Sequence, residues 1–460
     1  MRKVLAIAVG KLLAFAGGLM GRGSATPGAV ALRICPDLSE HLVLPGVKVA
    51  VTGSSGKGST SALIADALKD LGFKVVHNVS GSNMLNGIIS LLVRSSTIGG
   101  RIKGDALVFE VDERSCKHVF PFIRPQIVVV TNITRDQPPR QAHTDFIFDE
   151  IKKSLSGEER LVINGDNPLL MRFGLVEGPA GRTMDLSRIT TYGLADPDGF
   201  GSGESRFEAV DAAYCPICAS RLEYGFYLIE SIGDFRCPRG HFGRRLDVAA
   251  TGFVKGEALD GGEDAILVDE LLRVAANARL LYNVMNVLAA YTALCEMPLG
   301  LDREGIASAL SRQTVSKKLF TSYGWQGRQV FVLNNKAENA ATFNQSMLFA
   351  ANLPGPITLV VGWKEISRRY DTDDLSWLHD IAFELLAEKT TAAICTGVDA
   401  TGIAVRLKYA GIEEALIEAF EDMDERVSEA LAGTTGSIVA ILNFDHVEPF
   451  NQLMGQGDGK

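Results

Sequence analysis

Residues 50–61 read Ala-Val-Thr-Gly-Ser-Ser-Gly-Lys-Gly-Ser-Thr-Ser, and this stretch decides the fold. An apolar run at 47–51 precedes it, and a helix-like run at 60–71 follows it. Gly53 and Gly56 allow the backbone to turn its N–H groups inward, and the N-terminus of the following helix adds a favourable dipole for an anion. The stretch therefore predicts a loop that binds the phosphates of a nucleotide.

The loop offers one cation and two hydroxyl groups to a nucleotide. Lys57 is expected to reach the outer phosphates, and either Ser59 or Thr60 to offer a hydroxyl to Mg²⁺. The spacing departs from the usual G-x-x-x-x-G-K-[ST], because Val51 stands at the first glycine position and Gly58 follows the lysine. An ordinary strand-to-helix turn is the alternative. The residues expected to contact the nucleotide here are Gly53, Ser54, Ser55, Gly56, Lys57, Gly58, Ser59 and Thr60.

The composition favours an enzyme of several domains. A chain of 460 residues with 46% hydrophobic content can form two or three cores. The net charge of −9 argues against a protein that binds nucleic acid by neutralising its phosphates. Seven cysteines are too few for a disulfide framework, and three of them lie within residues 215–237. This distribution favours a reducing compartment and a metal site.

Four segments beyond the loop repeat the order of apolar strand and polar tip, and helix-like stretches lie between them. The segments are residues 74–83, 106–113, 127–137 and 161–167. The repetition predicts a parallel α/β sheet whose ligands gather at the strand ends. Glu110 and Asp112, two apart on a predicted strand, are expected to share a face and to approach one metal ion. For any single tip, a simple turn is the alternative.

Two cysteine pairs predict a zinc ribbon. Cys215-Pro-Ile-Cys218 and Cys237-Pro-Arg-Gly-His241 flank an aromatic-rich hairpin. Four protein ligands leave no open position on the metal, so Zn²⁺ would be structural. His241 is the least determined ligand, because the second pair reads C-x3-H instead of C-x2-C. Buried thiols without a metal are the alternative.

Two further clusters are candidates for binding. Asn283 and Asn286 lie at i and i+3 of a predicted helix, where they cap it, face solvent, or hold the base or ribose of the nucleotide. Acids at 371–374 suit a helix start. Trp377 and His379 beside them predict a docking surface or a contribution to a second site.

The first residues predict an amphipathic helix. Met1-Arg2-Lys3 and the apolar run after it resemble the start of a signal peptide, but Lys11 interrupts that run. The helix is expected to pack on the body or to touch a membrane surface. No stretch reaches the roughly 20 apolar residues that span a bilayer. The expected location is the cytoplasm, either free or at the inner face of the membrane.

Taken together, these segments resemble the Mur ligase superfamily, and within it the MurT type. The resemblance covers most of the chain, and its specific parts are the cysteine ribbon inside an ATP-binding domain and Arg135-Asp136-Gln137. It implies an α/β fold with a parallel central sheet, an inserted zinc ribbon and a smaller C-terminal α/β domain. The implied order is an N-terminal amphipathic segment (1–45), the central ATP-binding domain (46–314, ribbon at about 211–246), the C-terminal domain (315–450) and a flexible tail (451–460).

The resemblance also implies an ATP-dependent amide ligation. ATP would phosphorylate the α-carboxyl group of D-glutamate in the stem peptide of lipid II. Ammonia from a GatD-type class I glutaminase partner would then attack the acyl phosphate and give D-isoglutamine. The implied catalytic set is Lys57, Glu110, Asp136 and, near the partner, Asp374. Mg²⁺ would be held by Ser59 and Glu110, and the nucleotide would also contact Asn283 and Asn286.

The chain departs from the MurT pattern in several places. Gly-Lys-Gly-Ser-Thr in the loop is closer to folylpolyglutamate synthases, Lys317-Lys318 stand where Gly-Arg-x-Glu is usual, and Asn443-Phe444-Asp445-His446 replace Thr-Tyr-Thr-Ala. Two alternatives therefore stay open. One is a Mur-type or folylpolyglutamate-synthase-like ligase that adds an amino acid, and the other is an inactive nucleotide-binding scaffold that regulates a glutaminase.

Overall fold

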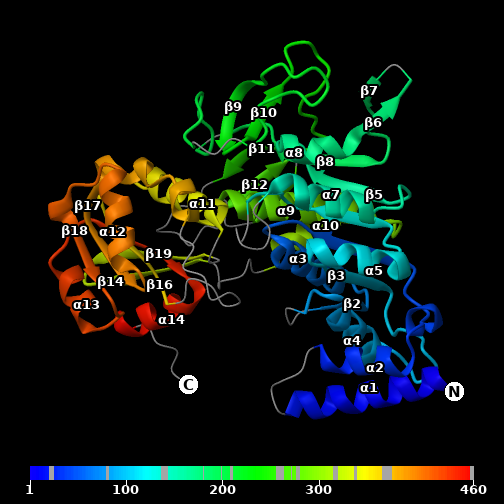
Figure 1. Ribbon diagram of the computed structural model, residues 1–460. Coiled ribbons are helices and arrows are strands. Elements are labelled where there is room, and N and C mark those ends of the chain that lie inside the picture. Colours follow the sequence, from blue (N-terminus) through cyan, green and yellow to red (C-terminus); the bar gives the residue numbers. More distant parts are fainter. Residues whose placement is uncertain are drawn as a thin grey trace.

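The structure is a computed structural model of the whole chain. The residues that it describes are 1–19, 25–78, 82–135, 143–179, 181–197, 199–207, 211–254, 264–270, 272–275, 280–313, 320–335, 339–364 and 376–455. Two sheets, flanked by helices, lie side by side (Figure 1).

The larger sheet has nine strands in the order β13-β12-β11-β8-β5-β4-β1-β3-β2. Its strands from β2 to β11 run parallel, whereas β12 and β13 run antiparallel to their neighbours. The bounds are β1 (Val47–Thr52), β2 (Val75–His77), β3 (Ala106–Glu110), β4 (Ile127–Val130), β5 (Arg160–Asn164), β8 (Ile189–Leu194), β11 (Val248–Val254), β12 (Ala265–Val268) and β13 (Leu272–Ala275). The parallel sheet predicted from the strand and tip pattern is confirmed.

Helices cover both faces of this sheet, so its central strands are buried on both sides. Successive residues of a strand point to opposite faces. Val49 and Val51 therefore join the core beneath α3 (Lys57–Asp70), α9 (Leu281–Cys295) and α10 (Arg303–Ser311). Ala50 joins the opposite core. The helices on that side are α1 (Arg2–Leu19), α2 (Thr26–Ile34), α4 (Leu85–Ser95), α5 (Cys116–Ile123), α7 (Thr144–Ser154) and α8 (Pro168–Met171).

An antiparallel hairpin carries the inserted cysteine segment. It consists of β9 (Glu223–Ile229) and β10 (Ile232–Arg236), and it projects at the top of Figure 1. A second, shorter hairpin, β6 (Leu175–Gly178) and β7 (Gly181–Met184), lies apart from it.

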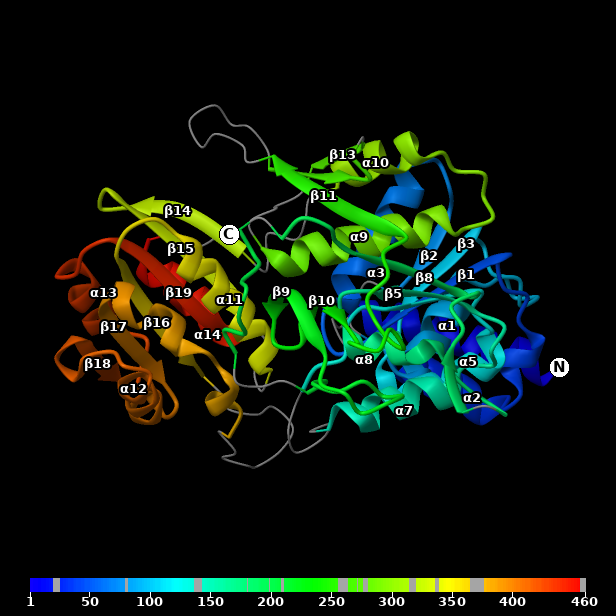
Figure 2. The same cartoon turned by 90° about the horizontal axis from the view of Figure 1, so that it is seen from above.

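The second sheet has six strands in the order β14-β15-β19-β16-β17-β18, all parallel except β14. Its strands are β14 (Phe320–Trp325), β15 (Arg328–Asn335), β16 (Ile357–Trp363), β17 (Thr390–Gly397), β18 (Ile417–Phe420) and β19 (Ser437–Asn443). Its helices are α11 (Ala340–Asn352), α12 (Ala400–Tyr409), α13 (Glu425–Ala432) and α14 (Phe444–Leu453). Figure 2 shows this sheet and the larger one as neighbouring bodies joined beside α9 and α11.

Two local expectations were wrong. β3 ends at Glu110, and Asp112 caps the short 3₁₀ helix η2 (Glu113–Ser115) by accepting from Arg114 N–H, so these carboxylates do not share a strand face. Trp377 is only 3% exposed and its ring packs 5.3 Å from the Trp363 ring. It belongs to the core of the second sheet and is not a docking residue.

Among the described residues, no helix has the length and apolar character that crossing a membrane requires. Helix α1, at the bottom of Figure 1, packs against α2 and α4 through Ala6, Ile7 and Gly10.

Candidate functional site

The phosphate loop joins the end of β1 to the start of α3, and its two inner glycines are required by their surroundings. Gly56 has φ +80°, and a Cβ there would lie 2.3 Å from Asn286 Oδ1. Gly53 has φ +125°, and a Cβ there would lie 2.5 Å from Thr131 Oγ1. Any side chain at these positions would be strained and would collide. The loop backbone thus lies so close to the end of β4 and to α9 that no Cβ fits at either glycine.

The end of β4 holds the first half of the loop in place. Ser54 N–H donates to the Asn132 carbonyl over 2.7 Å, and the Ser54 hydroxyl donates to the Thr134 carbonyl over 3.1 Å. Thr134 N–H in turn donates to the same hydroxyl over 3.1 Å. Ser54 therefore binds the segment that follows β4 and fixes this half of the loop.

Lys57, the first residue of α3, has an acidic partner that sequence reasoning missed. Its Nζ lies 2.7 Å from Glu113 Oε1 and also donates to the Gly53 carbonyl. The two side chains are 11% and 2% exposed. The acidic run after β3 was a signal for Glu113, but its approach to the lysine depends on the 3₁₀ turn η2. The ion pair orients the ammonium group beside the loop, where a phosphate would compete with the carboxylate for it.

Glu110 lies at the C-terminal end of β3, next to the start of α3. Its Oε2 is 3.2 Å from where a Cβ of Gly58 would stand, and its Oε1 accepts from Asn83 Nδ2 over 3.0 Å. Asn78, at the end of β2, bonds both the Glu110 N–H and the Glu110 carbonyl. The carboxylate is thus fixed beside the phosphate loop, as a hard oxygen ligand for Mg²⁺ should be.

The two hydroxyl candidates for Mg²⁺ have different surroundings. The Thr60 hydroxyl is fully buried and donates to Asn286 Oδ1 over 3.3 Å. Ser59 is partly exposed. The structure therefore favours Ser59 over Thr60 as the hydroxyl available to a metal ion.

Both asparagines of α9 are buried, so the solvent-facing alternative was wrong. Asn286 contacts the loop through Thr60, as described above. Asn283 lies one turn earlier, and among the described residues its Oδ1 is buried without a hydrogen-bond partner. An orphaned acceptor near a phosphate loop fits a nucleotide that donates a hydrogen bond from its base or ribose. Asp136 and Asp374, also predicted for the site, lie outside the described residues.

A partly buried histidine borders the site on the side of β2. His77 Nε2 lies 3.1 Å from Ser61 Oγ on α3. Burial lowers the pKa of His77 to about 4. The ring is therefore neutral near pH 7 and adds no charge to the phosphate region.

The four predicted zinc ligands meet at the base of the β9–β10 hairpin. One ligand atom from each of Cys215, Cys218, Cys237 and His241 lies within 4.8 Å of the others. Cys218 Sγ and Cys237 Sγ are 3.5 Å apart. Hydrogen bonds from Ser220 lower the pKa of the Cys218 thiol to about 5, which favours the thiolate form that binds metals. The donor set and its spacing fit tetrahedral Zn²⁺.

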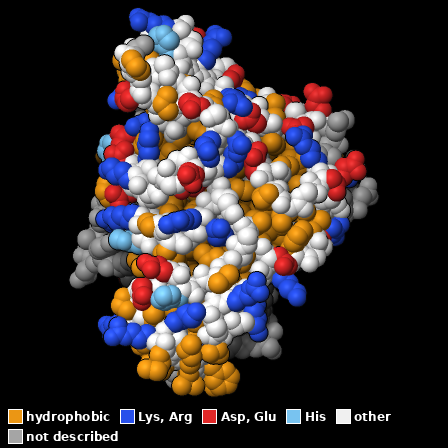
Figure 3. Space-filling model, turned by 90° about the vertical axis from the view of Figure 1, so that its right-hand side faces the viewer, with side chains coloured by type: hydrophobic (Ala, Val, Ile, Leu, Met, Phe, Trp, Pro, Cys, Tyr) orange, Lys and Arg blue, Asp and Glu red, His pale blue; other side chains and the backbone are white. Residues whose placement is uncertain are grey.

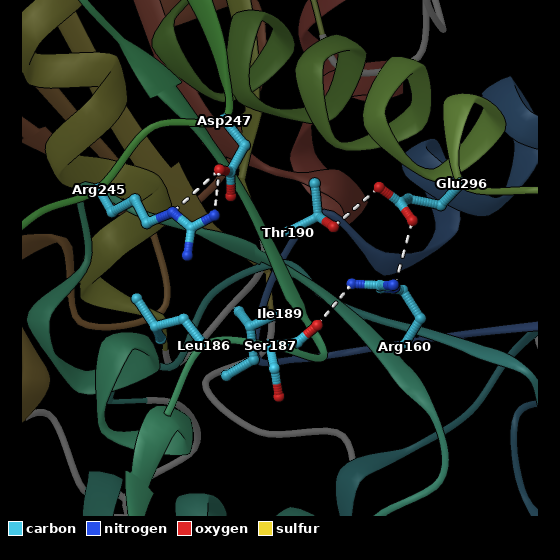
Figure 4. A pocket seen from close by; sticks show the side chains of 8 residues that line it. All are labelled: Arg160, Leu186, Ser187, Ile189, Thr190, Arg245, Asp247 and Glu296. Carbon is cyan, nitrogen blue, oxygen red and sulfur yellow. Dashed lines mark hydrogen bonds and ion pairs between the residues drawn. The ribbon is translucent and has the colours of Figure 1, made fainter. Parts of the chain in front are cut away.

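A pocket of about 410 Å³ lies at the N-terminal ends of β5 and β8, whereas the phosphate loop follows the C-terminal end of β1 (Figure 4). Its charged side chains point toward one another: Arg160 Nε lies 3.2 Å from Glu296 Oε2, and Arg245 Nη2 lies 2.6 Å from Asp247 Oδ1. Because these charges are paired and lie far along the strands from the phosphate loop, the pocket is not part of the candidate site.

Two family models match the chain. The Mur ligase middle domain matches residues 51–175, which contain the phosphate loop, Glu110 and Glu113. The MurT ligase C-terminal model matches residues 337–445, within the six-stranded sheet.

Curated relatives align along nearly the whole chain. The MurT subunit of lipid II isoglutaminyl synthase (glutamine-hydrolyzing) from Staphylococcus aureus (strain COL) is 28% identical over 99% of this chain and 98% of its own. The same subunit from Streptococcus pneumoniae (strain ATCC BAA-255 / R6) is 29% identical over 92% of this chain and 91% of its own.

Solved structures share the fold. A pseudomurein peptide ligase type C from Methanothermus fervidus superposes with a TM-score of 0.66 at 17% identity, over 92% of this chain and 80% of that chain. MurF ligase from Thermotoga maritima, solved in complex with ADP, gives 0.61 at 15% identity, over 93% and 83%. The fold, the two family models and the full-length relatives agree: the chain has the fold of Mur ligases and is similar along nearly its whole length to MurT subunits.

Proposed function

We propose that this protein is the ATP-dependent ligase subunit of a lipid II isoglutaminyl synthase. In the proposed reaction ATP phosphorylates the α-carboxyl group of D-glutamate in the lipid II stem peptide, and ammonia displaces the phosphate to give D-isoglutamine. The observation that carries the proposal is the phosphate loop with Lys57, Glu110 and Asn286 around it, in a chain that aligns end to end with MurT subunits.

The chain's own residues would act mainly by position and charge. A carboxylate is a poor electrophile and needs a phosphate as leaving group. Lys57, released from Glu113, would neutralise charge on the phosphoryl group as it moves. Ser59 and Glu110 would hold Mg²⁺, which would supply positive charge to the phosphate groups. Asn283 and Asn286 would orient the nucleotide, and Asp136 remains a proposed catalytic residue.

Ammonia would come from a class I glutaminase of the GatD type. The names of the relatives describe subunits of a glutamine-hydrolysing synthase, which supports a two-subunit arrangement. In that arrangement Asp374 would assist the partner's active site. Because the acceptor is lipid-linked, we place the reaction in the cytoplasm at the inner face of the membrane. For this chain we propose an ATP-binding domain at residues 46–314 and a C-terminal domain at residues 315–450.

The test uses the purified chain with ATP, Mg²⁺, lipid II and either ammonium or single amino acids. We expect phosphate release that depends on ammonium, together with an amidated product detected by mass spectrometry. Lys57→Met should lower the rate by about 10²–10³-fold, because it removes a charge that stabilises the transition state.

Lys69→Met is the matched control, since Lys69 lies in the last turn of the same helix and pairs with Asp66 on the surface. Its rate should stay near that of the wild type. Phosphate release with an amino acid and not with ammonium would assign the protein to the amino-acid-adding ligases instead. No ATP turnover under any condition would leave only the scaffold alternative.

A further inference from the structure

Helix α1 has two unlike faces, and only one of them is covered by the protein. Ala6, Ile7 and Gly10 are buried against the neighbouring helices. On the other side five large apolar side chains are 44–76% exposed: Val4, Leu5, Leu12, Phe15 and Leu19. We call these five residues the α1 stripe.

The stripe is continuous along the helix. At about 100° per residue, its five members and Ala8 fall within an arc of roughly 100°, opposite the buried residues. Single exposed apolar side chains are ordinary on protein surfaces, but a contiguous row of them marks a contact site. Figure 3 shows hydrophobic side chains gathered at the end of the molecule where α1 lies, with Lys and Arg side chains beside them.

The segment that carries the stripe is basic, and the first acidic residues, Asp37 and Glu40, come only at the short 3₁₀ helix η1 (Leu38–His41), which contacts α1. No Asp or Glu occurs among residues 1–36, whereas the region holds Arg2, Lys3, Lys11, Arg22 and Arg33, although the chain as a whole carries −9. Basic residues of neighbouring segments extend this region. Lys11 Nζ donates to the carbonyl of Arg94 over 2.8 Å. Burial, and then the nearby Lys103, lowers the pKa of Lys11.

We propose that α1 docks the protein on an anionic membrane surface, with the α1 stripe in the boundary between headgroups and acyl chains. A helix that is apolar on one side and surrounded by basic residues suits this position. Anionic lipid headgroups complement a segment, residues 1–36, that has five basic residues and no acidic one. The face of α1 that packs on α2 and α4 stays within the protein, so docking requires no unfolding. This proposal is independent of the reaction proposed above.

The test is co-sedimentation of the full-length protein with vesicles. We expect at least about tenfold stronger binding to phosphatidylcholine vesicles that contain phosphatidylglycerol than to pure phosphatidylcholine vesicles. Added NaCl should weaken the binding, because it screens the basic residues. The double variant Leu12→Glu with Phe15→Glu should lose at least about tenfold in binding, since it places two carboxylates in the stripe.

The matched control is Val405→Glu with Tyr409→Glu, which adds the same charge to two exposed apolar residues of α12. It should bind as the wild type does. Thermal unfolding would verify that both variants fold. Equal loss in the control, or equal binding to both kinds of vesicle, would overturn the proposal. A wild-type dimer that Leu12→Glu with Phe15→Glu dissociates would show instead that a second copy of the chain covers the stripe.

Discussion

The surroundings of Asn283 indicate a bound ligand. Its Oδ1 is buried without a partner among the described residues, one turn from the contact between Asn286 and Thr60. We predict that Asn283→Ala raises the Kd for ATP by about 5–30-fold, equivalent to roughly 1–2 kcal/mol for a lost hydrogen bond. Titration calorimetry with ATP and Mg²⁺ measures this change.

The same substitution should cost less stability than Asn286→Ala, because the oxygen that it removes has no partner among the described residues. Asn286→Ala is the comparison, since it removes the acceptor of the buried Thr60 hydroxyl. That variant should lose stability as well as ATP affinity, by about 1–3 kcal/mol. An unchanged Kd in Asn283→Ala would remove Asn283 from the nucleotide site.

At the residue scale, the sequence revealed those groups that local spacing determines. Lys57 follows from the glycine pattern, because a phosphate loop places its lysine at the start of a helix. Glu113 could not be assigned in the same way, since its contact with Lys57 depends on a 3₁₀ turn that breaks the strand pattern. The contact of Asn286 with the loop spans more than two hundred residues of sequence, and only the packing of α9 on α3 reveals it.

At the scale of elements, the cysteine hairpin makes a prediction of its own. Metal analysis of protein purified without chelators should find about one zinc per chain. Cys237→Ser should abolish the bound zinc, because Cys237 is one of the four grouped ligands and lies next to the end of β10. The loss should also expose the β9–β10 hairpin to proteolysis, since a structural zinc site supplies folding energy.

Cys295→Ser is the control for this experiment. Cys295 lies on α9, outside the four-ligand cluster. Its replacement should leave the zinc content unchanged. Wild-type protein without zinc, or with hairpin protection that survives chelation, would contradict the ribbon.

Elements with strong periodicity were predictable, and those fixed by distant contacts were not. The buried strands β1, β3 and β4 read directly as apolar runs, because a parallel sheet is covered on both faces. The acids that precede Trp377 favoured a surface position for it, yet its ring packs against Trp363 and Phe343. A single aromatic side chain carries no periodicity, so only the tertiary structure placed it in a core.

At the scale of the whole molecule, a polar junction links the two sheets next to the phosphate loop. Arg135, which follows β4, lies 2.6 Å from Asp211 of the inserted segment and 3.4 Å from Asp380 of the C-terminal part. Asn344 on α11 donates to the Asp380 carbonyl over 2.9 Å and lies 3.4 Å from Glu230 Oε1. Three parts of the chain thus meet at one cluster, in which the carboxylates outnumber the cations among the residues that the structure describes.

Glu230 makes this junction sensitive to pH. Burial, together with the nearby charges of Asp211 and Asp380, raises the pKa of Glu230 to about 7, although a hydrogen bond from Asn344 acts in the opposite direction. The unfolded carboxyl group titrates near 4.5, so the folded state holds more protons between these two values. The stability that Glu230 contributes is therefore complete below pH 4.5 and is lost as the pH rises through 7.

Glu230→Gln should remove this dependence, because the amide stays neutral at every pH. We expect the variant to match the wild type in urea unfolding at pH 5 and to exceed it by about 1–3 kcal/mol at pH 8. Glu223→Gln, at an exposed position of strand β9, is the control and should show no such gain. If Glu230→Gln is no more stable than the wild type at pH 8, ionisation of Glu230 in the junction does not lower the free energy of unfolding. Arg135 would then balance all three carboxylates, and the junction would act as a fixed ion-pair bridge instead of one that loosens above neutral pH.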